Sequence, residues 1–301
     1  MSDKFLFAQA RLFGNNVNPE MAEHRPTLEE RARILCVASG KGGTGKSFVS
    51  AFLSQQLARE GKNVLLLDAD FGLSDAHLYL GIQPKQNISA LLHDDLHSNG
   101  SVVENVSPQL DYLYGGSGLA GLAQLSSDQW GRLLKALFHY EKNYSHIVID
   151  LAAGIGAQVL PYLLSAPEIF LVTNPDALAL LDAYALLKIL VRKNYGGQLC
   201  LILNRATSQR GEKAAAALQN GISKMDPKFK VNYLGSISES MGIAEALKRK
   251  RSLLDLYPYD PASLDLKKIL KNYLGEEQSE DSRFKSDMSY FLKVKELGGK
   301  P

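Results

Sequence analysis

The chain has few cysteines, and neither of its two stands in a metal-binding or redox pattern. Cys36 and Cys200 each lie in an apolar, strand-like run, far from any C-x-x-C spacing, and the six histidines show no metal-ligand spacing. These absences argue against a disulfide framework, a zinc site and a dithiol redox centre. We therefore expect two buried thiols in a reducing compartment.

The chain also lacks a strong charge bias and a long apolar run. Its 34 Lys and Arg residues against 32 Asp and Glu residues leave a net charge of +2, which by itself does not indicate nucleic-acid binding. The most apolar segment, 177–191, is shorter than the about 20 residues that span a bilayer and is interrupted by Asp182 and Lys188. It predicts a packed helix. Residues 1–14 lack the pattern of a signal peptide, so we expect a cytoplasmic protein.

No Pro-rich or Ser-rich linker divides the middle of the chain. Hydrophobic residues make up 45% of the sequence, which is ample for a core. We predict one domain over 33–274, with an N-terminal tail over 1–32 and a C-terminal tail over 275–301.

The most informative segment is the glycine-rich run 39–47, S-G-K-G-G-T-G-K-S. It fits the pattern G-x-x-x-x-G-K-[ST], in which backbone N–H groups surround phosphates, Lys46 reaches the β- and γ-phosphates and the Ser47 hydroxyl ligates Mg²⁺. A strand-like run precedes it and a helical pattern follows, so the positive end of a helix points at the phosphates. The predicted nucleotide-binding set here comprises Gly42, Gly43, Thr44, Gly45, Lys46, Ser47 and Phe48.

Short β-rich runs alternate with helical patterns along the chain. Strands are predicted at 34–38, 64–68, 110–114, 146–150, 169–173, 199–204 and 231–237. Helices are predicted at 47–60, 127–140, 157–165, 176–193, 209–225, 239–250 and 261–273. The central strands are apolar at consecutive positions, which is typical of strands covered on both faces. The fold class is therefore α/β, a doubly wound, mostly parallel sheet with helices on both faces and ligands at the carboxyl ends of its strands.

Acidic residues stand at the ends of two predicted strands. Asp68 and Asp150 each close an apolar run, and Asp70 faces the same side as Asp68 because side chains alternate along a strand. With Ser47, Asp68 and Asp150 can hold Mg²⁺ directly or through water. Phosphoryl transfer needs mainly such ligands and a carboxylate that orients water, so no separate nucleophile is required.

Lys41 stands immediately before the glycine pair, where it is not needed by the nucleotide of its own subunit. With it the loop reads K-G-G-x-G-K-[ST], and the sequence resembles the deviant Walker A motif of the MinD/ParA ATPases, over roughly residues 33–270. The resemblance implies an ATP-sandwich homodimer in which Lys41 of one subunit reaches the phosphates of the other.

The same resemblance implies roles for the acidic residues. Asp68 and Asp70 match the first switch of the family, where Asp70 is the hydrolytic residue, and Asp150 with Gly154 matches the second switch. The catalytic set is then Lys41, Lys46 and Asp70.

The resemblance also implies residues that bind the nucleoside. The segment 173–176, which ends at Asp176, and Asp182 match a segment of the family whose acidic residues contact the ribose and the partner subunit. Asn204, followed by Arg205, matches the asparagine that reads adenine, a task that suits a carboxamide because it offers a donor and an acceptor. The resemblance thus adds Asp176, Asn204 and Arg205 to the binding set, with ATP and Mg²⁺ as cofactors.

Within the family, three local strings are closest to the FlhG (YlxH or FleN-like) branch, which controls flagellar number and placement. They are D-F-G-L-S at 70–74, D-A-Y-A-L at 182–186 and Y-P-Y-D-P-A-S at 257–263. The chain departs from that branch at Asp75 and His77, where Asn and Asp are usual, which places the first-switch contacts in question.

The N-terminal tail departs from the branch as well. Its activator motif, D-Q-A-x-x-L-R, is reduced here to Gln9-Ala10, so stimulation of a flagellar GTPase is unsupported. A docking element for a partner protein and a frayed terminus remain alternatives for the apolar residues of this tail, which are Phe5, Leu6, Phe7, Leu12 and Phe13.

The C-terminal tail combines an acidic linker with an amphipathic pattern at 284–297. Its helically spaced residues are Phe284, Met288, Phe291, Leu292 and Lys295. Such a helix can lie in a membrane interface, as the family's targeting helices do at this location, or pack on its own domain. Both alternatives stay open at the level of sequence.

The sequence therefore predicts a slow, partner-stimulated ATPase that dimerises with ATP, associates peripherally with the inner face of the membrane and controls flagellar number or placement. A MinD-like regulator of the division site is one alternative. Another is a ParA-like partitioning ATPase, favoured by the cations Lys248, Arg249, Lys250 and Arg251, which could bind DNA phosphates. A third is an adaptor that binds ATP and scarcely hydrolyses it.

Overall fold

The computed structural model describes residues 31–71, 74–92, 102–116, 127–156, 159–277 and 289–297. Eight strands form one sheet in the order β3-β4-β2-β5-β1-β6-β7-β8. All neighbours pair in parallel except β3 and β4, which pair antiparallel at one edge. The strands are β1 (Arg33–Ala38), β2 (Val64–Ala69), β3 (Glu104–Ser107), β4 (Leu110–Leu113), β5 (His146–Leu151), β6 (Glu168–Thr173), β7 (Gln198–Asn204) and β8 (Asn232–Ile237).

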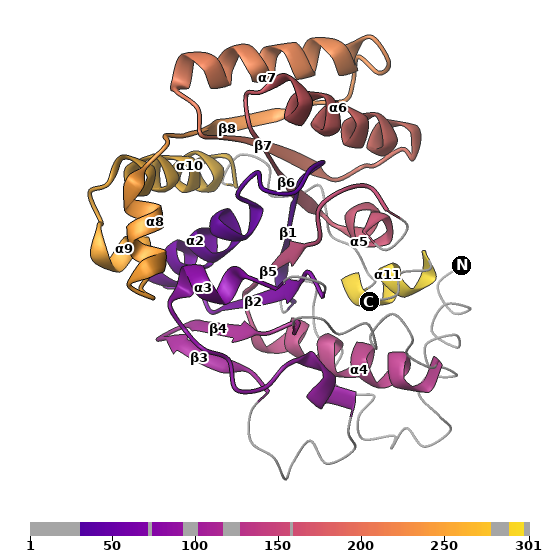
Figure 1. Ribbon diagram of the computed structural model, residues 1–301. Coiled ribbons are helices and arrows are strands. Elements are labelled where there is room, and N and C mark those ends of the chain that lie inside the picture. The colour runs from indigo at the N-terminus through magenta and orange to yellow at the C-terminus, as the bar shows by residue number, and fades with distance from the viewer. Residues whose placement is uncertain are drawn as a thin grey trace.

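Helices cover both faces of the sheet, and each face has its own apolar core (Figure 1). Alternate strand residues serve the two cores: Leu35 and Val37 face one, whereas Ile34 and Cys36 face the other. One core is covered by α2 (Lys46–Arg59), α3 (Ala76–Leu80), α8 (Met241–Lys248), α9 (Leu253–Leu256) and α10 (Pro261–Glu277). The other is covered by the 3₁₀ helix η3 (Ile88–Leu92) and by α4 (Ser127–Asn143), α5 (Leu160–Ser165), α6 (Ala177–Arg192), α7 (Ser208–Ser223) and α11 (Tyr290–Glu296).

This arrangement confirms the predicted doubly wound α/β class and all seven predicted strands. The structure adds an eighth strand, β3, which the sequence did not predict. Its four residues, E-N-V-S, are mostly polar and half-exposed because the strand lies at the sheet edge, so no apolar run marks it. The short helices α3 and α9 and the helix η3 were missed too, because four or five residues carry too little periodicity to recognise.

The described part of the C-terminal tail packs on the domain. In α11, the side chains of Tyr290, Phe291 and Val294 are buried against α4 and α5. The buried Glu141 of α4 binds the start of this helix, since its Oε1 accepts hydrogen bonds from Ser289 Oγ at 2.7 Å and from Phe291 N at 3.2 Å. The packing alternative is therefore the one seen here, and the apolar face of α11 is not free.

Other predictions for the tails fall outside the described residues, including the docking element within 1–30 and the apolar positions Phe284 and Met288. Among the described helices, none combines the length and apolarity needed to cross a membrane.

Candidate functional site

A phosphate-binding loop joins β1 to α2 at the carboxyl edge of the sheet. Gly43 and Gly45 have φ angles of 78° and 93°, which side-chain-bearing residues rarely adopt. Gly45 also forms the N-cap of α2, where no side chain caps the free N–H groups of the first turn. The loop thus presents backbone donors and a positive helix end toward an anion.

Two close approaches hold this loop in place. A Cβ at Gly40 would overlap the backbone of Asp182 in α6, so the loop lies directly on that helix. Gly154, which belongs to the second predicted switch, is also attached to the P-loop. Its backbone N donates a hydrogen bond of 2.8 Å to the carbonyl of Ser39. Asp182, predicted to contact the ribose or a partner subunit, lies here against the P-loop through its backbone.

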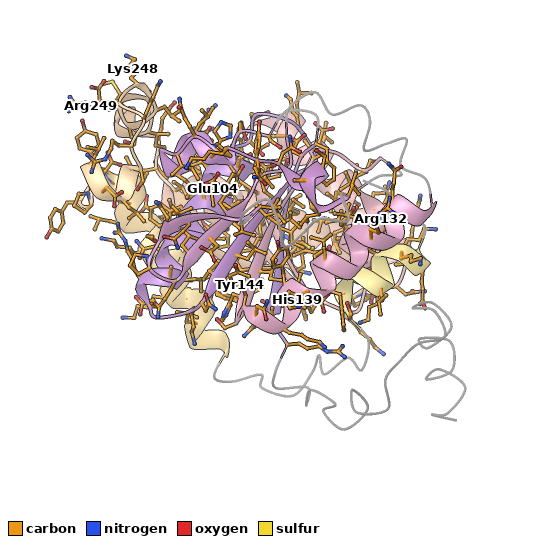
Figure 2. All side chains as sticks on the ribbon, turned by 90° about the horizontal axis from the view of Figure 1, so that it is seen from below. Glu104, Arg132, His139, Tyr144, Lys248 and Arg249 are labelled. Carbon is orange, nitrogen blue, oxygen red and sulfur yellow. The ribbon has the colours of Figure 1, made fainter. Side chains whose placement is uncertain are left out.

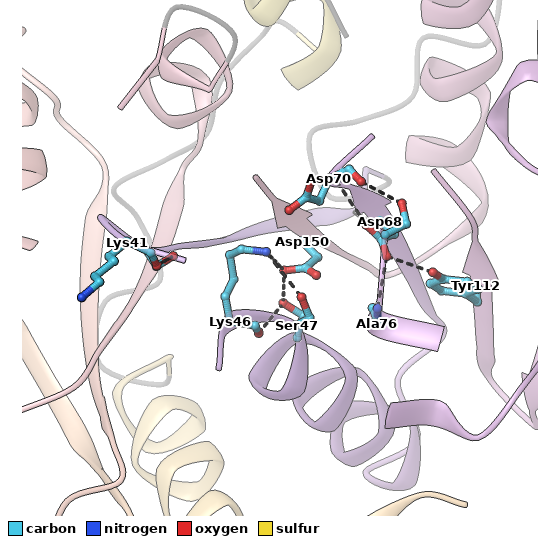
Figure 3. Close-up of polar contacts among 11 residues, drawn as sticks. Lys41, Lys46, Ser47, Asp68, Asp70, Ala76, Tyr112 and Asp150 are labelled. Atoms are coloured by element: carbon cyan, nitrogen blue, oxygen red, sulfur yellow. Dashed lines mark hydrogen bonds and ion pairs between the residues drawn. The ribbon is translucent and has the colours of Figure 1, made fainter. Parts of the chain in front are cut away.

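Lys46 and Asp150 form a buried ion pair at the centre of the site (Figure 3). Lys46 Nζ lies 2.9 Å from Asp150 Oδ1, and the Asp150 side chain is 0% exposed. The hydroxyl of Ser50, one turn into α2, lies 2.9 Å from the same oxygen. Burial lowers the pKa of Lys46, but the charges of Asp150, Asp70 and Asp68 and the hydrogen bond to Asp150 together outweigh this effect, and the pKa of Lys46 is raised.

Asp68 lies beside Asp150, since the two residues are paired across β2 and β5. Its carboxylate accepts three hydrogen bonds: from Asp70 N to Oδ1 at 3.2 Å, and from Ala76 N at 3.3 Å and Tyr112 Oη at 3.0 Å to Oδ2. Burial, and then the charge of Asp150, raise the pKa of Asp68. Asp68 therefore binds both ends of the loop that joins β2 to α3. This contact was not part of its prediction as a Mg²⁺ ligand.

Two other predicted catalytic residues lie on opposite sides of this centre. Asp70 follows β2 on the same side as Lys46, whose charge it stabilises, whereas the Lys41 side chain is exposed and points away from Lys46 and Asp150 (Figure 3). Lys41 is thus oriented away from the site of its own chain.

Of the three predicted base-binding residues, Asn204 contacts the P-loop directly. Asn204 Nδ2 donates to the carbonyl of Thr44 at 2.7 Å, and its Oδ1 accepts from Arg205 N at 3.0 Å. Arg205 is exposed with a φ of 53°, an uncommon conformation for this residue type. Asp176 caps α6, because its Oδ1 accepts from Ala179 N at 2.9 Å. Their roles toward adenine and ribose stay predictions.

Phe48, a member of the predicted nucleotide-binding set, has its side chain in the apolar core. The ring is buried and packs against the rings of Phe52 and Tyr79, with centroid distances of 6.2 and 5.6 Å. Only the backbone N–H of Phe48, in the first turn of α2, is placed for a phosphate.

The chemistry of the site fits a nucleotide phosphate and Mg²⁺. Two buried oxygen atoms in it have no hydrogen-bond partner among the described residues: Thr44 Oγ1 and Asp150 Oδ2. The Thr44 hydroxyl, the Lys46 ammonium and the uncapped N–H groups of the P-loop can bind phosphate oxygens. Asp150 Oδ2 and the Ser47 hydroxyl are oxygen ligands of the type that Mg²⁺ prefers. Within the described ranges no three acidic, His or Cys side chains form a metal-binding group.

Sequence reasoning missed two polar residues of the site, Ser50 and Tyr112. Ser50 lies one turn after the P-loop motif, and its helical position could have indicated a contact at the loop. Tyr112 lies 44 residues from Asp68 within an ordinary strand pattern, so nothing local in the sequence marks it.

Comparison with known proteins agrees with this geometry. The model of the CobQ/CobB/MinD/ParA nucleotide binding domain matches residues 35–254. The chain is 30% identical to the antiactivator FleN of Pseudomonas aeruginosa, over 79% of this chain and 84% of FleN. It is also 30% identical to the flagellum site-determining protein YlxH of Helicobacter pylori, over 79% of this chain and 80% of YlxH.

Solved structures share the fold. The cell division ATPase MinD of Pyrococcus furiosus superposes with a TM-score of 0.65 at 24% identity, covering 81% of this chain and 99% of that one. The septum site-determining protein MinD of Pyrococcus horikoshii, solved with Mg-ADP, gives a TM-score of 0.62 at 25% identity and covers 85% and 100% of the two chains.

Proposed function

Because this chain belongs to the CobQ/CobB/MinD/ParA nucleotide-binding family, we propose that it is a switch that hydrolyses ATP and alternates between a monomer and an ATP-sandwich dimer. The observation that carries the proposal is the opposite placement of two loop lysines. Lys46 is buried beside Asp150, whereas Lys41 is exposed and points away from that centre (Figure 3). A cation presented outward from a phosphate loop suits the phosphates of a second copy.

In this proposal the chain's own residues bind and orient the reactants. Lys46, Thr44 and the N–H groups of the P-loop hold the phosphates, while Asp70 orients the attacking water. Mg²⁺, held by Ser47 and Asp150 directly or through water, supplies charge neutralisation at the phosphates when bound. Because the output is a change of partner, slow turnover stimulated by a partner protein is expected.

We propose that the switch controls flagellar number or placement at the membrane. The support is the similarity, over most of the length of each protein, to the antiactivator FleN and to YlxH, whose printed name, flagellum site-determining protein, refers to placement. Peripheral membrane association through 284–297 requires α11 to leave the domain, because Phe291 and Val294 are buried there. A second copy in an ATP dimer would double any such attachment.

A second candidate is ParA-like binding to DNA. The observation in its favour is the exposed cation cluster at the end of α8, Lys248 to Arg251, from which Lys248 and Arg249 point outward (Figure 2). Arg249 is paired with Glu245 at 2.8 Å, which weakens the positive charge of the cluster. ATP-dependent retention of DNA that falls steeply with salt would favour this function.

Light scattering and an ATPase assay test the main proposal together. The protein should be a monomer with ADP and a dimer with ATP, and it should release phosphate. Lys41→Ala should keep ATP affinity but stay monomeric. Lys193→Ala, which removes an exposed lysine at the far end of α6, should behave as wild type. An ATP-dependent dimer of Lys41→Ala would refute the role of Lys41 toward the second copy.

A further inference from the structure

Tyr112 places its hydroxyl in the layer between the sheet and α2. The residue lies in β4, its side chain is fully buried, and its neighbours in this core are aliphatic and aromatic. The one hydrogen bond shown for its hydroxyl is donated to Asp68 Oδ2, over 3.0 Å. A buried phenol that reaches a carboxylate at a nucleotide site, from a strand that carries no other predicted site residue, calls for a functional explanation.

Asp68 connects both ends of the loop that follows β2. Its Oδ1 accepts from Asp70 N and its Oδ2 from Ala76 N, the first residue of α3 (Figure 3). The loop also rests on the chain after β4, because a Cβ at Gly115 would lie 2.9 Å from Ser74 Oγ. The position of Asp70 therefore depends on the orientation of the Asp68 carboxylate, which Tyr112 helps to hold.

The hydrogen bonds of Asp68 also affect Lys46. Asp68 and Asp150 lie opposite each other on neighbouring strands, and Lys46 forms its ion pair with Asp150. Three donors keep Asp68 directed to its own loop. Without the Tyr112 hydroxyl, the carboxylate has one donor fewer and a greater tendency to turn toward the ammonium of Lys46.

We propose that Tyr112 is a positioning residue of the nucleotide switch: through its hydrogen bond to Asp68 it holds the loop that carries Asp70 in the geometry needed for hydrolysis. The hydrolytic part rests on the proposed function. The positioning of the loop rests on the contacts alone, so the two can fail separately.

Tyr112→Phe tests this inference because it removes the hydroxyl and keeps the ring. Hydrogen exchange in the full-length protein should be about tenfold faster at the amides of Asp70 and Ala76, since their acceptor has lost a fixing donor. The kcat for ATP hydrolysis should fall by about tenfold, while affinity for a fluorescent ATP analogue stays within about twofold.

Tyr144→Phe is a matched control. Tyr144 donates a hydrogen bond of 2.6 Å to Asp111 Oδ2, so the change again removes a Tyr to Asp contact. Asp111 is the residue before Tyr112 in β4, but Tyr144, labelled in Figure 2, packs against the core on the other face of the sheet from Tyr112. This variant should change neither exchange at Asp70 and Ala76 nor kcat.

The outcomes separate clearly. Unchanged exchange at Asp70 and Ala76 in Tyr112→Phe overturns the positioning role. Faster exchange with unchanged kcat overturns the link between Tyr112 and hydrolysis. An equal fall in kcat and an equal rise in exchange in Tyr144→Phe would overturn the proposal too, because they show a general effect on the fold. If the wild-type protein hydrolyses no ATP, the proposed function fails, and exchange still decides whether Tyr112 positions the loop.

Discussion

The ammonium of Lys46 lies 2.9 Å from Oδ1 of Asp150, and both side chains are buried at the carboxyl edge of the sheet. The ion pair joins the P-loop to β5 across 104 residues of chain. It gives a buried positive charge a partner and directs it toward the loop that binds phosphate, which links stability and function in one contact.

Removing Lys46 should therefore affect both properties. Lys46→Ala leaves the charge of Asp150 buried without its partner, and we expect the free energy of unfolding to fall by about 3 kcal/mol or more and ATP binding to be lost. Urea unfolding and binding of a fluorescent ATP analogue measure the two effects. The double variant Lys46→Met with Asp150→Asn should recover stability but not ATP binding. Recovery of ATP binding in the double variant would contradict the role of Lys46.

Asp70→Ala should separate ATP binding from hydrolysis. The side chain is placed at the edge of the site, so its loss should lower the single-turnover rate by about a hundredfold while ATP affinity is kept. Asp75→Ala is the control, because Asp75 stands at the N-cap of α3 without a side-chain cap bond. Equal rates for Asp70→Ala and wild type would remove Asp70 from the mechanism.

His146 should make the protein less stable in acid. Burial first, and then the charges of Arg33 and Lys62, lower the pKa of His146 from 6.5 to about 4. The unfolded chain binds the proton more readily, so stability is full above pH 6.5 and is lost as the pH falls toward 4, by about 3 kcal/mol. Urea unfolding across this range measures the loss.

The contribution of His146 can be isolated by substitution. His146→Gln should remove this part of the pH dependence, whereas His139→Gln, which changes an exposed residue of α4, should keep it (Figure 2). Identical pH profiles for His146→Gln and wild type would show that other groups cause the loss.

Deleting 283–301 should abolish ATP-dependent binding to anionic liposomes without lowering ATP affinity. The deletion removes α11, whose Phe291 is 1% exposed against the domain and would have to leave it to reach lipid. Co-sedimentation with ATP, and with ADP as the control, measures membrane binding. Unchanged liposome binding by the shortened protein would sink the proposed role of this helix.

Features were predictable from the sequence when they depend on residues close together in the chain. The P-loop was predictable because Gly43, Gly45 and Lys46 act through local backbone geometry, and the central strands because they are apolar on consecutive positions. The edge strand β3 was not, since its pairing with β4 follows from the sheet and not from its own polar residues. The burial of the Phe48 ring was not predictable for a similar reason: packing against Phe52 and Tyr79 decided it, while the place of Phe48 in the nucleotide-binding set stays a prediction.

By itself, the sequence determined the α/β class, the phosphate loop and the acidic strand ends, because each depends on neighbouring residues whose periodicity or spacing is visible in one dimension. Only the tertiary structure decided that Tyr112 holds Asp68, that Asp68 faces Asp150 and that α11 packs on α4 and α5. These contacts join residues 44, 82 and about 150 positions apart, and burial in a common core, rather than any local preference, brings them together.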